Sequence, residues 1–204
     1  MKNLSQRIAL TCVFAAIFSL SGCSLFSPVS AKPPAAYELD SMPTMAIKKK
    51  RPVSILVLLP DEVSTYNTTS MAYSLRPYEV AYYTQSNWAE TPSQMLLPLL
   101  VQTLQSTHHF QSVVTPPFGG HYDYLLTTQI IKLEQDFTHQ PASLVFDVRV
   151  QLNRVALNRA VATKEFHVRQ RMFRNDAYSG VVAANIATET LLRKIANFTT
   201  ENTH

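Results

Sequence analysis

The chain has 204 residues, of which 46% are hydrophobic and 16% are charged, and its formal net charge is +4. An ordinary apolar content without low-complexity tracts is typical of a folded globular domain and argues against a disordered chain. The charge is too small to indicate a nucleic-acid partner.

Residues 1–22 have the pattern of a secretory signal peptide. Lys2 and Arg7 precede an uncharged run that ends at residue 20. This run is too short to cross a bilayer as a helix, which needs about 20 apolar residues. Residues 20–23 read Leu-Ser-Gly-Cys, and small residues directly before a cysteine resemble the bacterial lipobox.

The lipobox implies that Cys23 becomes the first mature residue and is acylated on its thiol and its amine. This chemistry requires cysteine because a thiol with a pKa of about 8.5 is nucleophilic near neutral pH. Cys12, Lys2 and Arg7 would leave with the signal peptide, so no disulfide is possible and the charge falls to about +2. Acyl chains contribute about 0.8 kcal/mol per buried methylene, which predicts stable anchoring to a membrane of the bacterial envelope. The alternative is that Cys23 is only a small residue of the signal peptide.

Residues 23–36 are rich in Ser, Pro and small side chains, which predicts a lipidated flexible tether. The alternation of apolar and polar residues at 37–40 predicts a short strand. A loop then ends in four consecutive cations, Lys48 to Arg51. Such a run is typical of a solvated loop, and the alternative is contact with anionic lipid headgroups at about 1 kcal/mol per charge.

The aliphatic run at 53–59, bounded by prolines, predicts a strand buried on both faces that should be the central strand. Residues 70–88 are crowded with aromatic side chains in two extended pieces about Arg76 and Pro77, which indicates a hairpin-like turn. Such an aromatic hairpin is either core or a surface for an apolar partner. We expect Trp88 to be core, and Tyr78 and Glu79 to lie nearer the surface as candidate contacts to a partner.

A helix is predicted from Pro92 to residue 106 or 107, with Thr91 as its cap and a kink at Pro98. A short strand is expected at 110–114. His108 and His109 should be exposed at the end of this helix. Neighbouring helical residues point about 100° apart and two ligands fall short of the usual three or four, so we expect no metal site there.

Three longer strands are predicted at 122–137, 143–157 and 160–173, and Asn158 with Arg159 is a plausible two-residue turn between the last two. A strict register across this turn places apolar residues opposite charged ones. One extra residue near Asn153 and Arg154 removes the conflict, which predicts a β-bulge there.

With this bulge, Leu152 faces Phe166, Val150 faces Val168 and Asp147 lies opposite Arg171. Arg149 and Arg169 then become like-charged neighbours on the outer face. Like charges side by side are mildly destabilising unless an anion or acidic partner lies between them. Arg149 and Arg169 are therefore candidate partner-binding residues.

A long helix is predicted from about 176 to 198, because apolar residues recur there at alternating spacings of four and three. The elements together predict an α/β protein of the α+β type, with a single domain at residues 37–200. Its mixed or antiparallel sheet should form one of two layers, with two main helices packed on one face.

The sequence carries no motif for catalysis, and we assign no catalytic residue, metal or cofactor. It lacks G-x-S-x-G, H-E-x-x-H, the P-loop and G-x-G-x-x-G, and its four glycines leave no phosphate-binding loop. A Ser-His-Asp triad stays open, because its members are distant in the chain.

Most of the mature chain resembles the ABC-type transport auxiliary lipoprotein family, which includes proteins like paraquat-inducible protein C. The resemblance rests on residues 37–40, 55–60, 71–73, 76–80, 88–90, 95–96 and 99–100. The most specific part runs from Arg-Pro-Tyr-Glu at 76–79 to Trp-Ala-Glu at 88–90. Pro98 departs from many members.

The resemblance implies a non-enzymatic lipoprotein that faces the periplasm and works with an MCE-domain protein, a permease and an ATPase. Such systems move phospholipids or other hydrophobic compounds between membranes. Ser24 after the lipid-bearing cysteine resembles the outer-membrane sorting pattern. The alternative functions are direct carriage of a lipid or hydrophobe in an apolar pocket and hydrolysis in the envelope. The oligomeric state is left open, and a homo-oligomer is one alternative.

Overall fold

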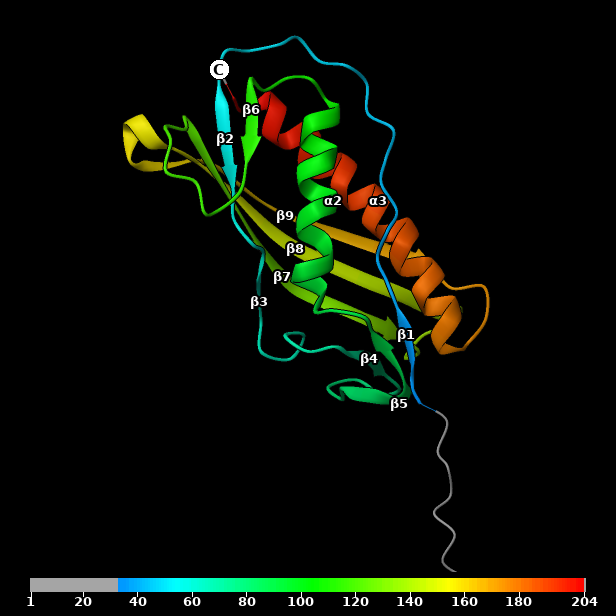
Figure 1. Ribbon diagram of the computed structural model, residues 1–204. Helices are drawn as coiled ribbons and strands as arrows, with labels where there is room; N and C mark the ends of the chain where they lie inside the picture. The colour runs from blue at the N-terminus through cyan, green and yellow to red at the C-terminus, as the bar shows by residue number, and fades with distance from the viewer. Residues whose placement is uncertain (1–32, 204) are drawn as a thin grey trace, which may run out of the picture. The chain divides into compact units, whose positions relative to one another are not determined.

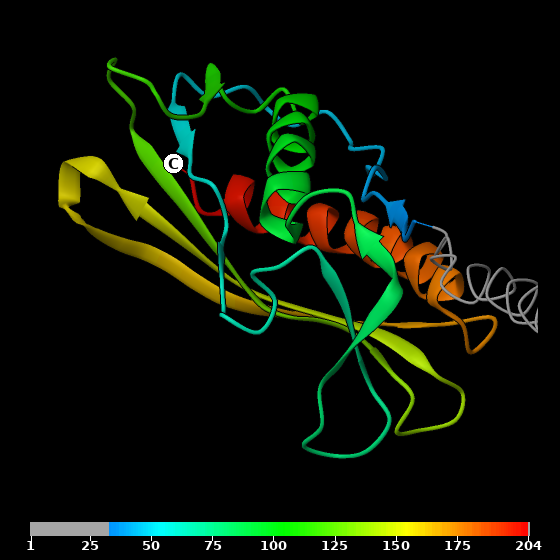
Figure 2. The ribbon, with the colours of Figure 1, turned by 60° about the horizontal axis from the view of Figure 1, so that its bottom comes forward.

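A computed structural model describes residues 33–203, which form one open mixed β-sheet with two α-helices on one side (Figures 1 and 2). The strands are β1 (Ala35–Tyr37), β2 (Ser54–Val57), β3 (Asp61–Glu62), β4 (Ser70–Ser74), β5 (Ala81–Trp88), β6 (Ser112–Val114), β7 (Tyr124–Asp136), β8 (Ser143–Arg154) and β9 (Arg159–Arg171). The helices are α2 (Pro92–Ser106), the 3-10 turn η1 (Val155–Leu157) and α3 (Ala177–Glu201). This confirms the predicted α+β class. Cys23 and most of the expected tether lie outside the described residues, and β1 begins inside the tether's expected range.

β7 is the central strand of the sheet, in place of the 53–59 strand that we expected. It pairs in parallel with β2, β3 and β4 along one edge and antiparallel with β8 along the other. β2 lies between β7 and β6 and is buried, as its aliphatic sequence predicts. β7 is central because its 13 residues are long enough for three short strands to pair with it in succession.

The register of β8 and β9 differs from the expected one by four residues. Leu152 pairs with Ala162 and Val148 with Phe166, so the predicted Leu152–Phe166, Val150–Val168 and Asp147–Arg171 pairs are wrong. The reason is a longer connection: η1 and Asn158, at φ 47°, form the turn in place of Asn158 and Arg159. The bulge lies at the predicted end of the hairpin but belongs to β9, where Val161 is the extra residue.

The inner face of β8 and β9 packs against α3. The apolar stripe of α3 is buried as predicted, with Leu191 and Ile195 fully inaccessible. Asp176 caps the helix and accepts a hydrogen bond from the Ser179 N–H at 2.7 Å. α2 lies across α3 and beside β6, and its leucine face closes the same core. One core therefore joins the sheet and both helices.

The β4–β5 hairpin confirms the turn predicted about Pro77. Its two strands are antiparallel, and Trp88 at the end of β5 is 4% exposed. The backbone N–H of Trp88 donates to Thr69 O at 2.7 Å, and Ala89 N donates to Tyr37 O at 2.8 Å. Trp88 is therefore core, as we expected.

At the end of α2 only one of the two histidines is exposed, so the expectation that both are exposed is wrong for His109. His108 is exposed at φ 52°, but His109 is buried, with Nε2 2.9 Å from Thr203 Oγ1. Burial lowers the pKa of His109, and the nearby Arg51 and Lys48 lower it further. Within residues 33–203 we find no grouping of three potential metal ligands and no helix with the length and apolar character of a membrane span.

Replacing Trp88 by alanine should destabilise the domain by about 3 to 5 kcal/mol, because the large side chain leaves a cavity between β5 and the core. This predicts a drop in thermal midpoint of roughly 10 °C for a domain of this size, measurable by circular dichroism. Leu75→Ala, in the same hairpin but 56% exposed, is the control and should leave the midpoint unchanged. A small drop for Trp88→Ala would show that the hairpin is not part of the core.

Candidate functional site

The tip of the β4–β5 hairpin exposes more apolar surface than its surroundings. Leu75, Val80 and Tyr82 are each between 41% and 56% exposed, and Tyr78 is fully exposed. We call these four residues the hairpin patch. Large apolar side chains gathered on one exposed turn are typical of a surface that binds a partner.

The turn of the hairpin holds Tyr78 in an unusual backbone conformation. Tyr78 has φ 68°, in the left-handed region that costs a residue with a side chain roughly 1 kcal/mol. An ion pair between Arg76 Nε and Glu79 Oε2, 3.0 Å apart, closes the turn beneath it. The hydrogen bond from Arg76 lowers the pKa of Glu79. The turn thus holds the Tyr78 ring out into solvent, where a partner could reach it.

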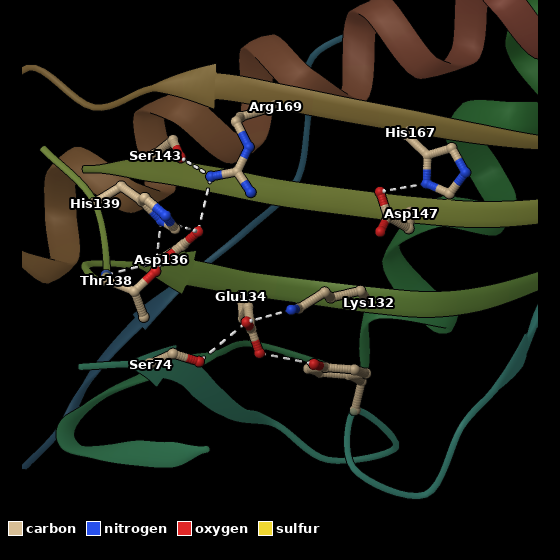
Figure 3. A network of polar contacts seen from close by, with 11 residues as sticks. Ser74, Lys132, Glu134, Asp136, Thr138, His139, Ser143, Asp147, His167 and Arg169 are labelled. Atoms are coloured by element: carbon tan, nitrogen blue, oxygen red, sulfur yellow. Dashed lines mark hydrogen bonds and ion pairs between the residues drawn. The ribbon is translucent and has the colours of Figure 1, made fainter. Parts of the chain in front are cut away.

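A cluster of polar side chains lies on the sheet face that points away from the helices (Figure 3). Glu134 is 3% exposed and accepts hydrogen bonds from Tyr66 Oη at 2.8 Å and Ser74 Oγ at 3.0 Å. Lys132 Nζ lies 2.7 Å from the same carboxylate. Burial and the neighbouring Glu134 raise the pKa of Tyr66. These contacts fasten the loop after β3 and the end of β4 onto β7.

Asp136 and Arg169 form the next part of this face. Arg169 Nη1 lies 2.8 Å from Asp136 Oδ2 and 2.7 Å from Ser143 Oγ. Burial alone would raise the pKa of Asp136, but hydrogen bonds from Thr138 and Arg169 outweigh burial and lower it to about 2. Arg169 therefore holds β9 to the end of β7 across β8.

Arg149 is also paired within the domain, so the expected like-charged contact between Arg149 and Arg169 is absent. Arg149 Nε and Nη2 lie 2.9 and 2.6 Å from Glu165 Oε1, and Nη1 lies 3.2 Å from Gln129 Oε1. The four-residue change of register places Glu165 opposite Arg149 and Val145 opposite Arg169. The two arginines therefore need no anion between them, although both guanidinium groups remain about half exposed.

Lys132, Glu134 and Asp136 are not recognisable as a group from the sequence alone. They share a face because they alternate along β7, and the register shift between Ile130 and Lys132, which leaves Ile131 as an extra residue, turns that face away from the helices. Before the bulge the even-numbered residues face the helices, and after it Leu133, 2% exposed, takes the inner face. Ile130 and Leu133 both face inward but lie three positions apart, in place of the two of a regular strand. This spacing is the signal of the bulge in the sequence.

Several solved structures share the fold of this chain at low sequence identity. A protein of Xanthomonas campestris is 17% identical, with 83% of this chain and 92% of that chain covered and a TM-score of 0.69. An uncharacterised protein is 15% identical, with 82% and 99% covered and a TM-score of 0.68. A hypothetical protein of Chlamydia trachomatis is 10% identical, with 74% and 98% covered and a TM-score of 0.51. A search of curated proteins finds no match.

The open mixed sheet with two helices on one side defines the chain as an α+β domain. The family model of the ABC-type transport auxiliary lipoprotein component matches residues 37–196. The chain therefore belongs to the ABC-type transport auxiliary lipoprotein family, which confirms the resemblance found in its sequence. The family supports an accessory, non-enzymatic role beside a transporter and a membrane-anchored location in the envelope.

Asp136→Asn should reduce the free energy of unfolding by about 1 to 2 kcal/mol at pH 6, because it removes a paired carboxylate. The folded-state pKa of about 2 lies below the ordinary value of 3.8. The stabilisation is therefore complete above about pH 4 and is lost as the pH falls toward 2. Urea titrations of both proteins at pH 6 and pH 2.5 measure this convergence. Asp61→Asn, at an exposed carboxylate, is the control, and a difference as large at pH 2.5 as at pH 6 would contradict the assignment.

Proposed function

We propose that the protein is a non-enzymatic adaptor anchored in the outer membrane through a lipid on Cys23. In this proposal its domain faces the periplasm and docks an MCE-domain protein that works with a permease and an ATPase. The cargo would be phospholipids or other hydrophobic compounds. The observation that carries the proposal is the exposed hairpin patch on a domain whose core is otherwise filled.

The filled core supports an adaptor rather than a direct lipid carrier. Val148 on the sheet and Leu191 and Ile195 on α3 are fully inaccessible, so the sheet and helix meet without an apolar chamber. A surface cavity beside α2 measures about 440 Å³, and exposed polar side chains form its rim. A carrier needs an apolar pocket that encloses most of its ligand.

The contacts of Thr138 and His139 give little support to the hydrolase alternative. Thr138 Oγ1 lies 2.7 Å from His139 Nδ1, and Asp136 Oδ2 lies 3.8 Å from the same nitrogen. A catalytic triad uses the two different nitrogens of the imidazole, one for the hydroxyl and one for the carboxylate. The hydroxyl also donates to Asp136 directly, which further separates this arrangement from a triad.

The docking surface that we propose is centred on Tyr78 and Glu79. The ring of Tyr78 supplies an apolar body with a polar tip, as residues that dominate binding energy commonly do. Arg149 and Arg169 are proposed as additional contacts on the outer sheet face, because their guanidinium groups are about half exposed beside their ion-pair partners. A partner at these two residues would have to share them with Glu165 and Asp136.

Tyr78→Asn should weaken co-purification of the MCE-domain protein while leaving the domain folded. Asparagine tolerates the left-handed backbone conformation that Tyr78 adopts, so the thermal midpoint should stay the same or rise slightly. Loss of an anchor worth about 2 kcal/mol corresponds to roughly thirtyfold weaker binding. The measurement is the amount of partner recovered with an affinity-tagged chain, together with the midpoint.

The matched control is Phe118→Asn, which removes a 41% exposed aromatic ring before the start of β7. The hairpin pairs with the other end of β7, at residues 134–136, so Phe118 is remote from the patch. Unchanged recovery for Tyr78→Asn would remove the hairpin from the docking surface, and equal losses for both variants would point to a nonspecific apolar effect.

Cys23→Ser should release the protein from membrane fractions, because the acyl chains supply most of the membrane affinity. The domain should remain folded, since it begins more than ten residues later. Cys12→Ser is the matched control and should leave the protein anchored. The test is fractionation after salt and carbonate washes. A Cys23→Ser protein that stays with the membrane would show that the lipobox assignment is wrong.

A further inference from the structure

A surface groove of about 440 Å³ lies between α2 and the extended segment that follows β1. Leu39, Met95 and Leu99 form its apolar floor, and each is less than a tenth exposed. Its rim carries the exposed carboxylates Glu38 and Glu90, with Asp40 beside them. We call these lining residues the acidic groove.

The polar groups of the acidic groove lack cationic partners. None of the three rim carboxylates takes part in an ion pair within residues 33–203, and no lysine or arginine lines the groove. Pro98, which also lines it, has no N–H, so the carbonyl of Gln94 lacks its usual helical donor. The groove therefore offers acceptors above an apolar floor and suits a segment that is both cationic and apolar.

The wall of the groove is held in place by one side chain from α3. Asn185 Oδ1 accepts from the backbone N–H of Asp40 at 2.9 Å and of Ser41 at 3.2 Å, and its Nδ2 donates to Glu38 O at 3.0 Å. These three bonds fix the extended segment against the helix layer. A prearranged groove loses little conformational freedom when a segment binds.

A segment with the complementary character occurs in the same chain, at residues 47–51. Ile47 is 77% exposed, and the four cations that follow it form no ion pair among the described residues. Two backbone hydrogen bonds fix the segment to the end of α2, from Lys48 N to Thr107 O at 2.8 Å and from Arg51 N to His109 O at 2.7 Å. We call residues 47–51 the basic segment.

We propose that the acidic groove of one copy of the protein receives the basic segment of a second copy. A chain cannot fill its own groove while these backbone bonds persist, because the acidic rim lies near the start of α2 and the basic segment lies at its end. The 15 residues of α2 separate the two by about 22 Å. Figure 1 shows the chain running past both helices between these two places.

The contact joins two different surfaces of identical chains, so it is heterologous. In a dimer one copy keeps an unused basic segment and the other keeps an unused groove, so further copies can add until the assembly closes as a ring or grows as an open filament. A groove of this size and a basic segment in which only the cations Lys49 and Lys50 are exposed predict a weak contact that salt weakens further. This inference does not rest on the proposed function, since it requires neither a transporter nor a cargo.

The test is disulfide cross-linking of the full chain in membranes that express two differently tagged copies. One copy carries Glu38→Cys and the other carries Lys50→Cys, both at exposed positions. Mild oxidation should give a mixed dimer that contains both tags, whereas neither variant alone and no wild-type pair should give a dimer. A Glu38→Cys homodimer, or no dimer from any pair, overturns the proposal.

Charge reversal makes the test specific. Lys49→Glu in the Lys50→Cys copy should lower the mixed dimer at least tenfold, and Asp40→Lys in the Glu38→Cys copy should do the same. Both reversals together should restore it. Lys194→Glu, at an exposed lysine of α3 outside both surfaces, is the control and should have no effect.

Two further outcomes overturn the proposal in favour of another occupant. If no mixed dimer forms and Lys49→Glu instead reduces binding of the Cys23→Ser chain to vesicles with anionic lipid, the basic segment binds a membrane. If Asp40→Lys reduces only recovery of the transport partner, the groove belongs to that partner. Thermal midpoints of all variants show whether each domain is folded.

Discussion

The pairing of β7 along both of its edges is the constraint on which the rest of the structure depends. Three short strands pair with one edge in succession, and β8 pairs with the whole length of the other. The inner face of the sheet packs α3, and the outer face carries the carboxylates that hold β4 and β9 in position. β7 therefore positions the β4–β5 hairpin directly, and it positions the helix layer through β8 and β9, on which α3 packs.

Local sequence patterns predicted the elements well, because burial imposes a period on each of them. The apolar stripe of α3 and the apolar residues that alternate along β8 are buried in the structure. The α2 helix begins at Pro92 with Thr91 as its cap, as these two residues predict. The register between strands could not be predicted in the same way. It depends on the length of the turn at residues 155–158 and on single extra residues, which leave only faint traces in a sequence.

In the candidate site, too, exposure within one turn could be predicted from local sequence, whereas contacts between strands could not. We expect Tyr78 to lie nearer the surface than Trp88, and the structure confirms its exposure. The roles of Arg149 and Arg169 depended on which residues face them, and that required the register. Their ion pairs with Glu165 and Asp136 link strands of one domain, so an unpaired charge cannot be inferred from sequence spacing alone.

The extra residue at Ile131 is the position at which β7 can lose a residue without exchanging its two faces. A substitution there alters one side chain and leaves both faces intact. Loss of the codon would remove the bulge and let Ile130 and Lys132 pair in regular succession with Val148 and Asp147, so that Leu133 stays on the inner face. Loss of a regularly paired residue elsewhere in β7 would instead exchange the faces of its neighbours, so length variation within this strand should be confined to the bulge.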